Sequence, residues 1–409
     1  MIRVVLFICF WFTSAAMWGQ SLTVSQVLRS ALSSPEVSGF EKQIDWLNQG
    51  RYGLPWVNTL ELRTRNNELL FNRQQYALRL DIENPLKVIH NKRYFETQQQ
   101  LSALRRQRAL KEGLTNRYIL LVRFMEAEHV RAIRMKEDSL VRKLLEAQRS
   151  RVGLAGFDAS DLVEAQLDVV SRQADRREAE FDFATIQSRL ARLSGAAGSE
   201  IQGLNAQIQP EEIAVLYDSV RQGVNLTVVM EKAKEVELAS RKVAVDKVSY
   251  TMGWVQGMYV PFRRDEGERP AGLALGLTIP LFNKNKDDEA RDQLDVLEEE
   301  AELQQLKSET ADQWVERKES LRLLLSHYKS VVEQLDDLQA DSFNTIDTLN
   351  DYDPVPRIKL EMELLKFKLL LSKIRYSILT EWILLLDDSD IIGQLPLRNY
   401  LSGSLERLD

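Results

Sequence analysis

The residues best suited to chemistry are sparse in this 409-residue chain and do not gather into a catalytic pattern. The three histidines, His90, His129 and His327, lie far apart on expected helices, which argues against a zinc site. The only cysteine is Cys9, so no disulfide framework is expected in the rest of the chain. The sequence has no G-x-x-x-x-G-K-[ST], G-x-S-x-G or H-E-x-x-H pattern. We therefore expect neither an enzyme nor a cofactor or metal site.

The acidic residues with the most distinctive setting lie near a proline-rich break between two helical stretches. Asp347, Asp351 and Asp353 come just before or within the segment Asp351-Tyr-Asp-Pro-Val-Pro356. Repeated around a symmetric oligomer, these carboxylates would form rings that favour cations in a water-filled channel. As isolated side chains they are ordinary solvated turn residues. The sequence leaves both interpretations open.

Four segments alternate apolar and polar residues with the period of two that is typical of β-strands. They form two expected hairpins, over 56–83 and 248–281. One face is expected to carry the apolar side chains Tyr76, Leu78, Leu80, Leu273, Leu275, Leu277 and Ile279. Arg79 and Asp81 alternate with them on the other face.

This alternation has two interpretations. Strands of roughly ten residues match a tilted strand that crosses a bilayer, with the apolar face toward lipid and the polar face toward an aqueous lumen. A soluble antiparallel sheet with one wet face has the same pattern. Tyr76, Tyr250 and Trp254 are candidates for an aromatic girdle at a membrane boundary, although ordinary packing also uses such residues.

Long helices must position these hairpins. From Pro85 to Val152 the chain has no further proline and one glycine, Gly113. At about 1.5 Å per residue, a helix over this span would be about 100 Å long. Most of its surface is polar, so we expect its narrow apolar stripe to pack against neighbouring helices as in a coiled coil.

The order helix, hairpin, long helix, turn and helix occurs twice, which indicates an internal duplication. At the N-terminus, Arg3 precedes a short apolar run and then small residues, which is typical of a secretory signal peptide; an N-terminal anchor is the alternative. We predict a signal peptide at 1–19, a first repeat at 20–209 with helices at 85–193, a second repeat at 210–390 with helices at 283–386, and a C-terminal tail at 391–409.

Four strands cannot close a barrel, and an open strand edge is not tolerated in lipid. Three copies would supply twelve strands, which can close. Trimerisation thus follows from the membrane interpretation and does not support it independently.

Several segments resemble a known family in the same order along the chain. Gly276-Leu-Thr-Ile-Pro-Leu-Phe-Asn283 resembles the strand-to-helix motif of the outer membrane efflux (TolC-like) proteins, and Ile82-Glu-Asn-Pro-Leu86 is a weaker copy. Arg151-Val-Gly-Leu-Ala-Gly-Phe-Asp-Ala-Ser-Asp-Leu-Val-Glu-Ala-Gln166 resembles the turn at the periplasmic tip of that family. Ala31-Leu-Ser-Ser-Pro-Glu36 resembles its opening helix. The similarity covers nearly all of residues 22–390.

The resemblance implies a mainly α fold with a membrane β-barrel. It implies a homotrimer with a 12-stranded barrel in the outer membrane of a Gram-negative bacterium and an α-helical barrel of coiled coils in the periplasm. Such ducts are passive and work with a periplasmic adaptor (membrane fusion) protein and an inner-membrane pump; the first tip favours the resistance-nodulation-division type. The tip residues that would dock the adaptor are Val152, Gly153, Leu154, Gly156 and Asp161.

Other points stay open at this stage. The second tip, 349–357, lacks the glycine turn of the family and contains two prolines that stiffen it. A soluble periplasmic coiled-coil scaffold or adaptor is the alternative function. The net charge of −7 gives no basic footprint for nucleic acid. The sequence does not fix the substrate, which is a drug, metal ion, peptide or protein, nor the pump class, the residues that close the aperture or the signal cleavage site.

Overall fold

The computed structural model describes residues 22–50, 52–66, 74–153, 157–195, 201–202, 208–220, 226–248, 252–260, 271–277, 286–349 and 354–408. These residues belong to two compact units. The helical unit takes its described residues from Met1–Ser34, Ala109–Asn225 and Thr310–Asp409, and the sheet unit from Pro35–Arg108 and Leu226–Glu309. Each unit combines segments of both expected repeats. The boundaries of the two compact units therefore differ from the boundaries of the two repeats.

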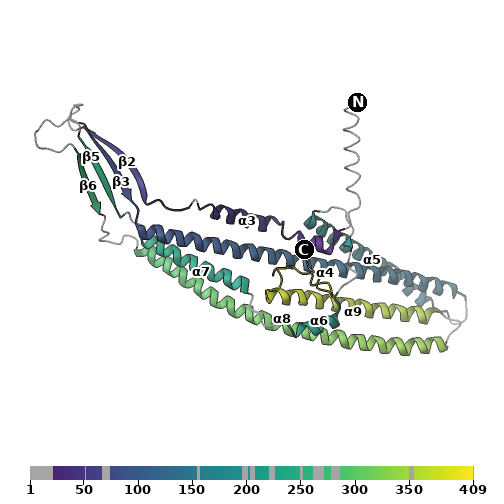
Figure 1. The fold of residues 1–409 in the computed structure, drawn as a ribbon. Helices are drawn as coiled ribbons and strands as arrows, with labels where there is room; N and C mark the ends of the chain where they lie inside the picture. Colours follow the sequence, from purple (N-terminus) through teal and green to yellow (C-terminus); the bar gives the residue numbers. More distant parts are fainter. Residues whose placement is uncertain are drawn as a thin grey trace, which may run out of the picture. The chain divides into compact units, whose positions relative to one another are not determined.

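The sheet unit contains one four-stranded antiparallel sheet. Its strands are β2 (Val57–Asn66), β3 (Gln74–Ile82), β5 (Gly253–Tyr259) and β6 (Ala271–Leu277). They are ordered β2-β3-β5-β6, so the hairpin β2-β3 is joined to the hairpin β5-β6 by the pairing of β3 with β5 (Figure 1). The strands expected from the alternating segments are therefore present, and the two hairpins form one surface.

Ion pairs connect the helices of the sheet unit, and three of them serve as examples. The helices are α3 (Pro35–Asn48), α7 (Leu226–Lys247), the first part of α4 (Pro85–Ser150) and the first part of α8 (Lys286–Leu349). Arg106 of α4 lies 2.7 Å from Glu41 of α3. Arg105 of α4 lies 2.7 Å from Glu235 of α7, and Lys247 of α7 lies 3.0 Å from Glu289 of α8. Such half-exposed pairs contribute little stability each, but they fix which helices are neighbours.

The helical unit contains the second parts of α4 and α8, together with α5 (Ala159–Ser194) and α9 (Pro354–Asp388). Phe124 of α4 packs on Phe183 of α5, with ring centroids 5.1 Å apart. Helix α9 lies beside both α4 and α8 (Figure 1). Leu144 of α4 clusters with Val355 of α9, and Arg317 Nη1 of α8 lies 3.3 Å from Glu381 Oε2 of α9. Arg176 Nη1 of α5 donates to Asp138 Oδ2 of α4 at 3.1 Å, and Arg134 of α4 lies 3.3 Å from Asp175 of α5.

Shorter elements complete the helical unit. They are the parallel strand pair β1 (Leu22–Thr23) with β4 (Ile201–Gln202), and the helices α2 (Val24–Arg29) and α6 (Pro210–Tyr217). In the described part of the chain, two helices, α2 and α3, thus precede the first hairpin, and two more, α6 and α7, precede the second. Thr23 and Gln26 form a capping box that starts α2, and Pro35, which lacks a backbone N–H, begins a new helix.

A buried polar network lies in the core of the helical unit. Lys111 of α4 is 3% exposed, and its Nζ lies 2.9 Å from Asp390 Oδ1 and 3.7 Å from Asp387 Oδ1. Thr115 Oγ1 donates to Asp387 at 2.8 Å. Burial raises the pKa of the Asp387 carboxyl, although Lys111 and Thr115 act in the opposite direction. The network joins α4 to the end of α9.

The expected C-terminal tail is packed into this core. Leu397, Leu401 and Leu408 are buried, and Leu408 N donates to the Leu397 carbonyl at 2.8 Å. The buried hydroxyl of Tyr118 donates to the carbonyl of Arg398. The irregular segment after α9 is therefore an integral part of the helical unit.

Candidate functional site

One face of the four-stranded sheet is apolar. Residues that pair across strands share a face, so two rows of side chains can be followed through the register. The first is Leu60, Leu80, Val255 and Leu275, and the second is Leu62, Leu78, Gly257 and Leu273. The exposed fractions of Leu273, Leu275 and Leu277 are 72%, 71% and 76%. The single chain thus leaves this face uncovered; Ile279 lies outside the described residues.

The opposite face carries its polar side chains mainly on β2 and β3, and some of them form a connected group. Thr59 Oγ1 of β2 donates to Asp81 Oδ2 at 2.6 Å. Arg79 Nε donates to Asp81 Oδ1 at 2.8 Å, and the Arg79 guanidinium carbon lies 4.9 Å from the centroid of the Trp254 ring. Arg79 and Asp81 therefore lie on the face opposite the leucines, as the alternation predicted.

The grouping of Trp254 with Tyr76 in one aromatic girdle is wrong. Trp254 pairs with Asp81 and Gly276 and belongs to the polar face, whereas Tyr76 pairs with Tyr259 on the apolar face. Tyr76 and Tyr259 are 40% and 52% exposed, so these two tyrosines are the aromatic pair of the apolar face. The register between the two hairpins has no local signal in the sequence, and grouping Trp254 with Tyr76 depended on that register. Tyr250 lies outside the described residues.

The first helical tip has an ordered beginning and end. Gly153 follows α4 with φ +89°, a conformation that favours glycine. Asp158 caps α5 by accepting a hydrogen bond from Ser160 N at 2.8 Å, and that bond lowers the pKa of the Asp158 carboxyl. Val152 is 57% exposed, and Asp161 lies in the first turn of α5. Leu154 and Gly156 lie outside the described residues.

The second tip connects α8, which ends at Leu349, with α9, which begins at Pro354. Proline suits the first helical position because its missing N–H has no partner there anyway. Asp351 and Asp353 lie outside the described residues, as does the side chain of Asp347. The hypothesis of acidic rings therefore stays a prediction.

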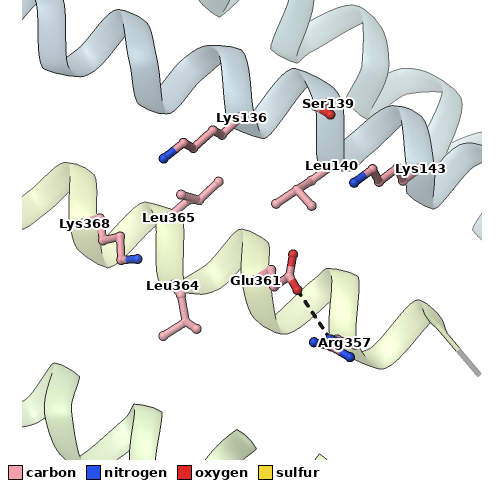
Figure 2. A pocket seen from close by; sticks show the side chains of 9 residues that line it. All are labelled: Lys136, Ser139, Leu140, Lys143, Arg357, Glu361, Leu364, Leu365 and Lys368. Carbon is pink, nitrogen blue, oxygen red and sulfur yellow. Dashed lines mark ion pairs between the residues drawn. The ribbon is translucent and has the colours of Figure 1, made fainter. Parts of the chain in front are cut away.

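Figure 2 shows a groove between α4 and α9, close to the beginning of α9. Its cavity volume is about 600 Å³. The lining residues are Lys136, Ser139, Leu140 and Lys143 of α4 and Arg357, Glu361, Leu364, Leu365 and Lys368 of α9. Only one of the four cations is paired within the groove, Arg357 with Glu361 at 3.5 Å. The groove therefore combines buried leucines with a basic rim, which favours an anionic partner.

Neither the groove nor the stacking of Arg79 on Trp254 was predicted. A groove between helices distant in sequence leaves no local signal. The sequence feature closest to the stack is the alternation of Trp254 with Gln256, on a strand that pairs with the glycine-containing strand β6.

Among the described residues, no group of three or more His, Cys, Asp or Glu side chains is placed to hold a metal ion. No helix in the described part of the chain is long and apolar enough to cross a membrane.

Comparisons with known proteins place the fold. No protein-family model matches the sequence, and no curated protein matches it. The transmembrane channel protein CusC matches with a TM-score of 0.66 and 11% identity, over 90% of this chain and 91% of that one. The outer membrane channel CmeC of Campylobacter jejuni matches with 0.60 and 12%, over 94% and 86%.

The outer membrane channel MtrE of Neisseria gonorrhoeae matches with a TM-score of 0.63 and 11% identity, over 92% of this chain and 90% of that one. At such low identity the likeness concerns the fold alone. It agrees with the observed sequence of elements, two hairpins inserted among long helices. The resemblance drawn from the sequence motifs is thus confirmed at the level of the fold: the chain has the fold of the TolC-like outer membrane efflux channels.

Proposed function

We propose that this chain is one subunit of a passive exit duct through the outer membrane of a Gram-negative bacterium. The observation that carries the proposal is the uncovered apolar face of the sheet. Leu60, Leu62 and the three leucines of β6 are all more than 60% exposed in the single chain. Soluble proteins rarely leave a contiguous apolar surface bare, whereas strands that face lipid present such a surface.

The sheet edges support assembly of three copies. In the order β2-β3-β5-β6, the outer strands β2 and β6 each have one edge that no strand of the described chain covers. Lipid does not tolerate unpaired backbone groups, so β6 of one copy must pair with β2 of the next. Three copies make a closed barrel of twelve strands, with the apolar face outside and the face of Arg79 and Asp81 inside.

The helical unit also has apolar surface that requires a partner. Val163, Leu167 and Val170 recur at four and three residues along α5 and are 54%, 66% and 66% exposed. On α8, Val315 and Leu323 are 53% and 57% exposed. Because α4 and α9 lie between these two helices, we infer that α5 of one copy packs against α8 of the next. Such a head-to-tail contact closes into a ring.

The partners of the duct follow from the same proposal. The protein is exported by its signal peptide at 1–19, and its helices extend into the periplasm. A periplasmic adaptor docks at the first tip, around Val152, Gly153 and Asp161, and connects the duct to an inner-membrane pump, of which the resistance-nodulation-division type is favoured. The basic rim of the groove between α4 and α9 supports an adaptor with an acidic face. The duct breaks no bond and selects little; its substrates pass through the lumen.

Assembly in the outer membrane tests the proposal. The mature protein should fractionate with the outer membrane and migrate as a trimer that heating dissociates. Leu167→Asp should abolish that trimer, because it places a charge in the contact between copies. Asp168 follows Leu167 but points away from all three stripe residues, so Asp168→Asn, which changes the charge by the same amount, should leave the trimer intact. A monomer that stays soluble without detergent would refute the duct and favour a periplasmic scaffold.

A further inference from the structure

The polar face of the sheet carries a group of side chains that spans all four strands, which we name the junction cluster. It consists of Thr59 on β2, Arg79 and Asp81 on β3, Trp254 on β5 and Gly276 on β6. A tryptophan is unexpected on this face, since its neighbours across the strand pairing are Asp81 and a glycine. The large apolar ring lies on the same face as Arg79 and Asp81.

The Trp254 ring occupies space that only a glycine at 276 leaves free. A Cβ atom at Gly276 would lie 2.4 Å from both Cε2 and Nε1 of the indole. Real Cβ atoms do not approach so closely, so any larger residue at 276 must displace the ring. By contrast, a Cβ atom at Gly257, on the same strand as Trp254, would meet nothing within 4 Å. The indole is therefore seated on the backbone of β6.

Arg79 and Asp81 hold each other in fixed positions beside this ring. Asp81 accepts hydrogen bonds from Thr59 at 2.6 Å and from Arg79 at 2.8 Å. The same guanidinium lies 4.9 Å from the indole centroid, a cation–π distance. Charge-assisted hydrogen bonds restrict the rotamers of both side chains. The cluster is thus a connected, electrically neutral group rather than a set of independent surface residues.

The cluster lies at the end of the sheet from which the long helices continue. Asp81 precedes Pro85, the first residue of α4, by four residues, and Trp254 pairs with Asp81. This inference rests on the proposed function: in a trimeric barrel, symmetry places three copies of the cluster at one height on the lumen wall. That height is where the strand barrel meets the helical tunnel.

We propose that the junction cluster is the size- and charge-determining constriction of the duct. The three Trp254 rings narrow the lumen, and Gly276 seats each ring. Arg79 neutralises Asp81, so that the constriction has little preference between cations and anions. Without the three guanidinium groups, three carboxylates would remain at one height, and an acidic ring favours cations.

Conductance of purified wild-type and variant trimers in planar lipid bilayers tests the size part of the proposal. Trp254→Ala should increase the single-channel conductance in symmetric potassium chloride. Gly276→Ala should change the conductance as well, because it displaces the ring. Gly257→Ala is the matched control and should conduct as the wild type does. Combining Gly276→Ala with Trp254→Ala should give the conductance of Trp254→Ala alone, since no ring remains to be displaced.

Reversal potentials in a potassium chloride gradient test the charge part. Arg79→Gln should shift the reversal potential toward the potassium equilibrium potential. Adding Asp81→Asn to Arg79→Gln should restore the wild-type value, because the uncompensated carboxylate is then removed. Each variant is first checked for heat-dissociable trimers, so that a folding defect is not mistaken for a change in the pore.

The outcomes separate this inference from the proposed function. If the wild type forms channels but Trp254→Ala and Arg79→Gln both retain its conductance and reversal potential, the constriction is refuted while the duct stands. If wild-type trimers form no channel at all, the proposed function fails and the inference fails with it.

Discussion

The sheet and the core of the helical unit break the rule of apolar inside and polar outside in opposite ways. On the sheet, Leu275 and Leu277 are more than 70% exposed, whereas in the helical unit Lys111 is 3% exposed. The positive charge of the buried lysine is compensated within the chain by the carboxylates of Asp387 and Asp390. The exposed leucines have none, because no described part of the chain covers their face.

The difference identifies what surrounds each region. A buried charge is tolerated when it is paired and hydrogen-bonded, so the helical unit is complete with respect to its own interior. An exposed apolar face is tolerated where lipid covers it, and the proposed duct accounts for the sheet in this way. Adding a charge to the apolar face of the sheet and removing the buried charge from the helical unit should therefore both be destabilising, for opposite physical reasons.

The largest effect is expected from a charge on the apolar face of the sheet. Leu275→Arg, or equally Leu277→Arg, should cost about 2–4 kcal/mol per copy near the bilayer midplane, and three copies share one barrel. Outer-membrane trimers should disappear on gels run without heating. Ala274→Arg lies on the opposite face of the same strand and should still assemble. Normal trimers of Leu275→Arg would mean that this face does not contact lipid.

Removal of the buried lysine should destabilise the helical unit strongly. Lys111→Met leaves Asp387 and Asp390 without their cation, and breaking one partner of a buried pair costs about 3–5 kcal/mol. The midpoint of urea unfolding, followed by circular dichroism, measures the loss. Lys329→Met removes an exposed lysine of α8 and should change stability by less than about 0.5 kcal/mol.

Further substitutions in the same network should partly restore the stability that Lys111→Met loses. Adding Asp387→Asn and Asp390→Asn to Lys111→Met should recover part of the lost stability, because the uncompensated charges are then gone. An unfolding midpoint of Lys111→Met close to that of the wild type would show that water reaches these carboxylates.

A smaller, pH-dependent effect is expected from Asp387. Burial raises the pKa of its carboxyl above the ordinary value of 3.8, so the folded state binds the proton more tightly than the unfolded chain. The contribution of Asp387 to the free energy of unfolding therefore increases as the pH falls through the raised pKa, and levels off near 3.8. Asp387→Asn should lose this dependence, as urea titrations at several pH values would detect. Parallel pH profiles of wild type and variant would contradict the raised pKa.

The sequence predicted the elements that depend on local pattern and missed those that depend on pairing at a distance. The fold was predicted from two local patterns: the alternation of apolar and polar residues in β2, β3, β5 and β6, and the run without further proline in α4. The face of Trp254 depended on the register between β3 and β5, which joins hairpins more than 150 residues apart and has no local signal. The burial of Lys111 likewise depends on Asp387 and Asp390. The C-terminal segment was expected to be irregular, and its packing depends on contacts with α4.

The smallest effect is expected where that C-terminal segment meets α4. Tyr118 is 1% exposed, and burial raises the pKa of its hydroxyl, which stays protonated and donates to the Arg398 carbonyl. Tyr118→Phe removes the donor to the Arg398 carbonyl, in a part-buried hydrogen bond, which should cost about 1 kcal/mol. Urea unfolding measures the loss, and Tyr328→Phe, on the half-buried surface of α8, is the control. Faster proteolysis after residue 390 in Tyr118→Phe would locate the loss in the C-terminal segment, whereas unchanged stability and proteolysis would mean that the buried leucines alone hold it.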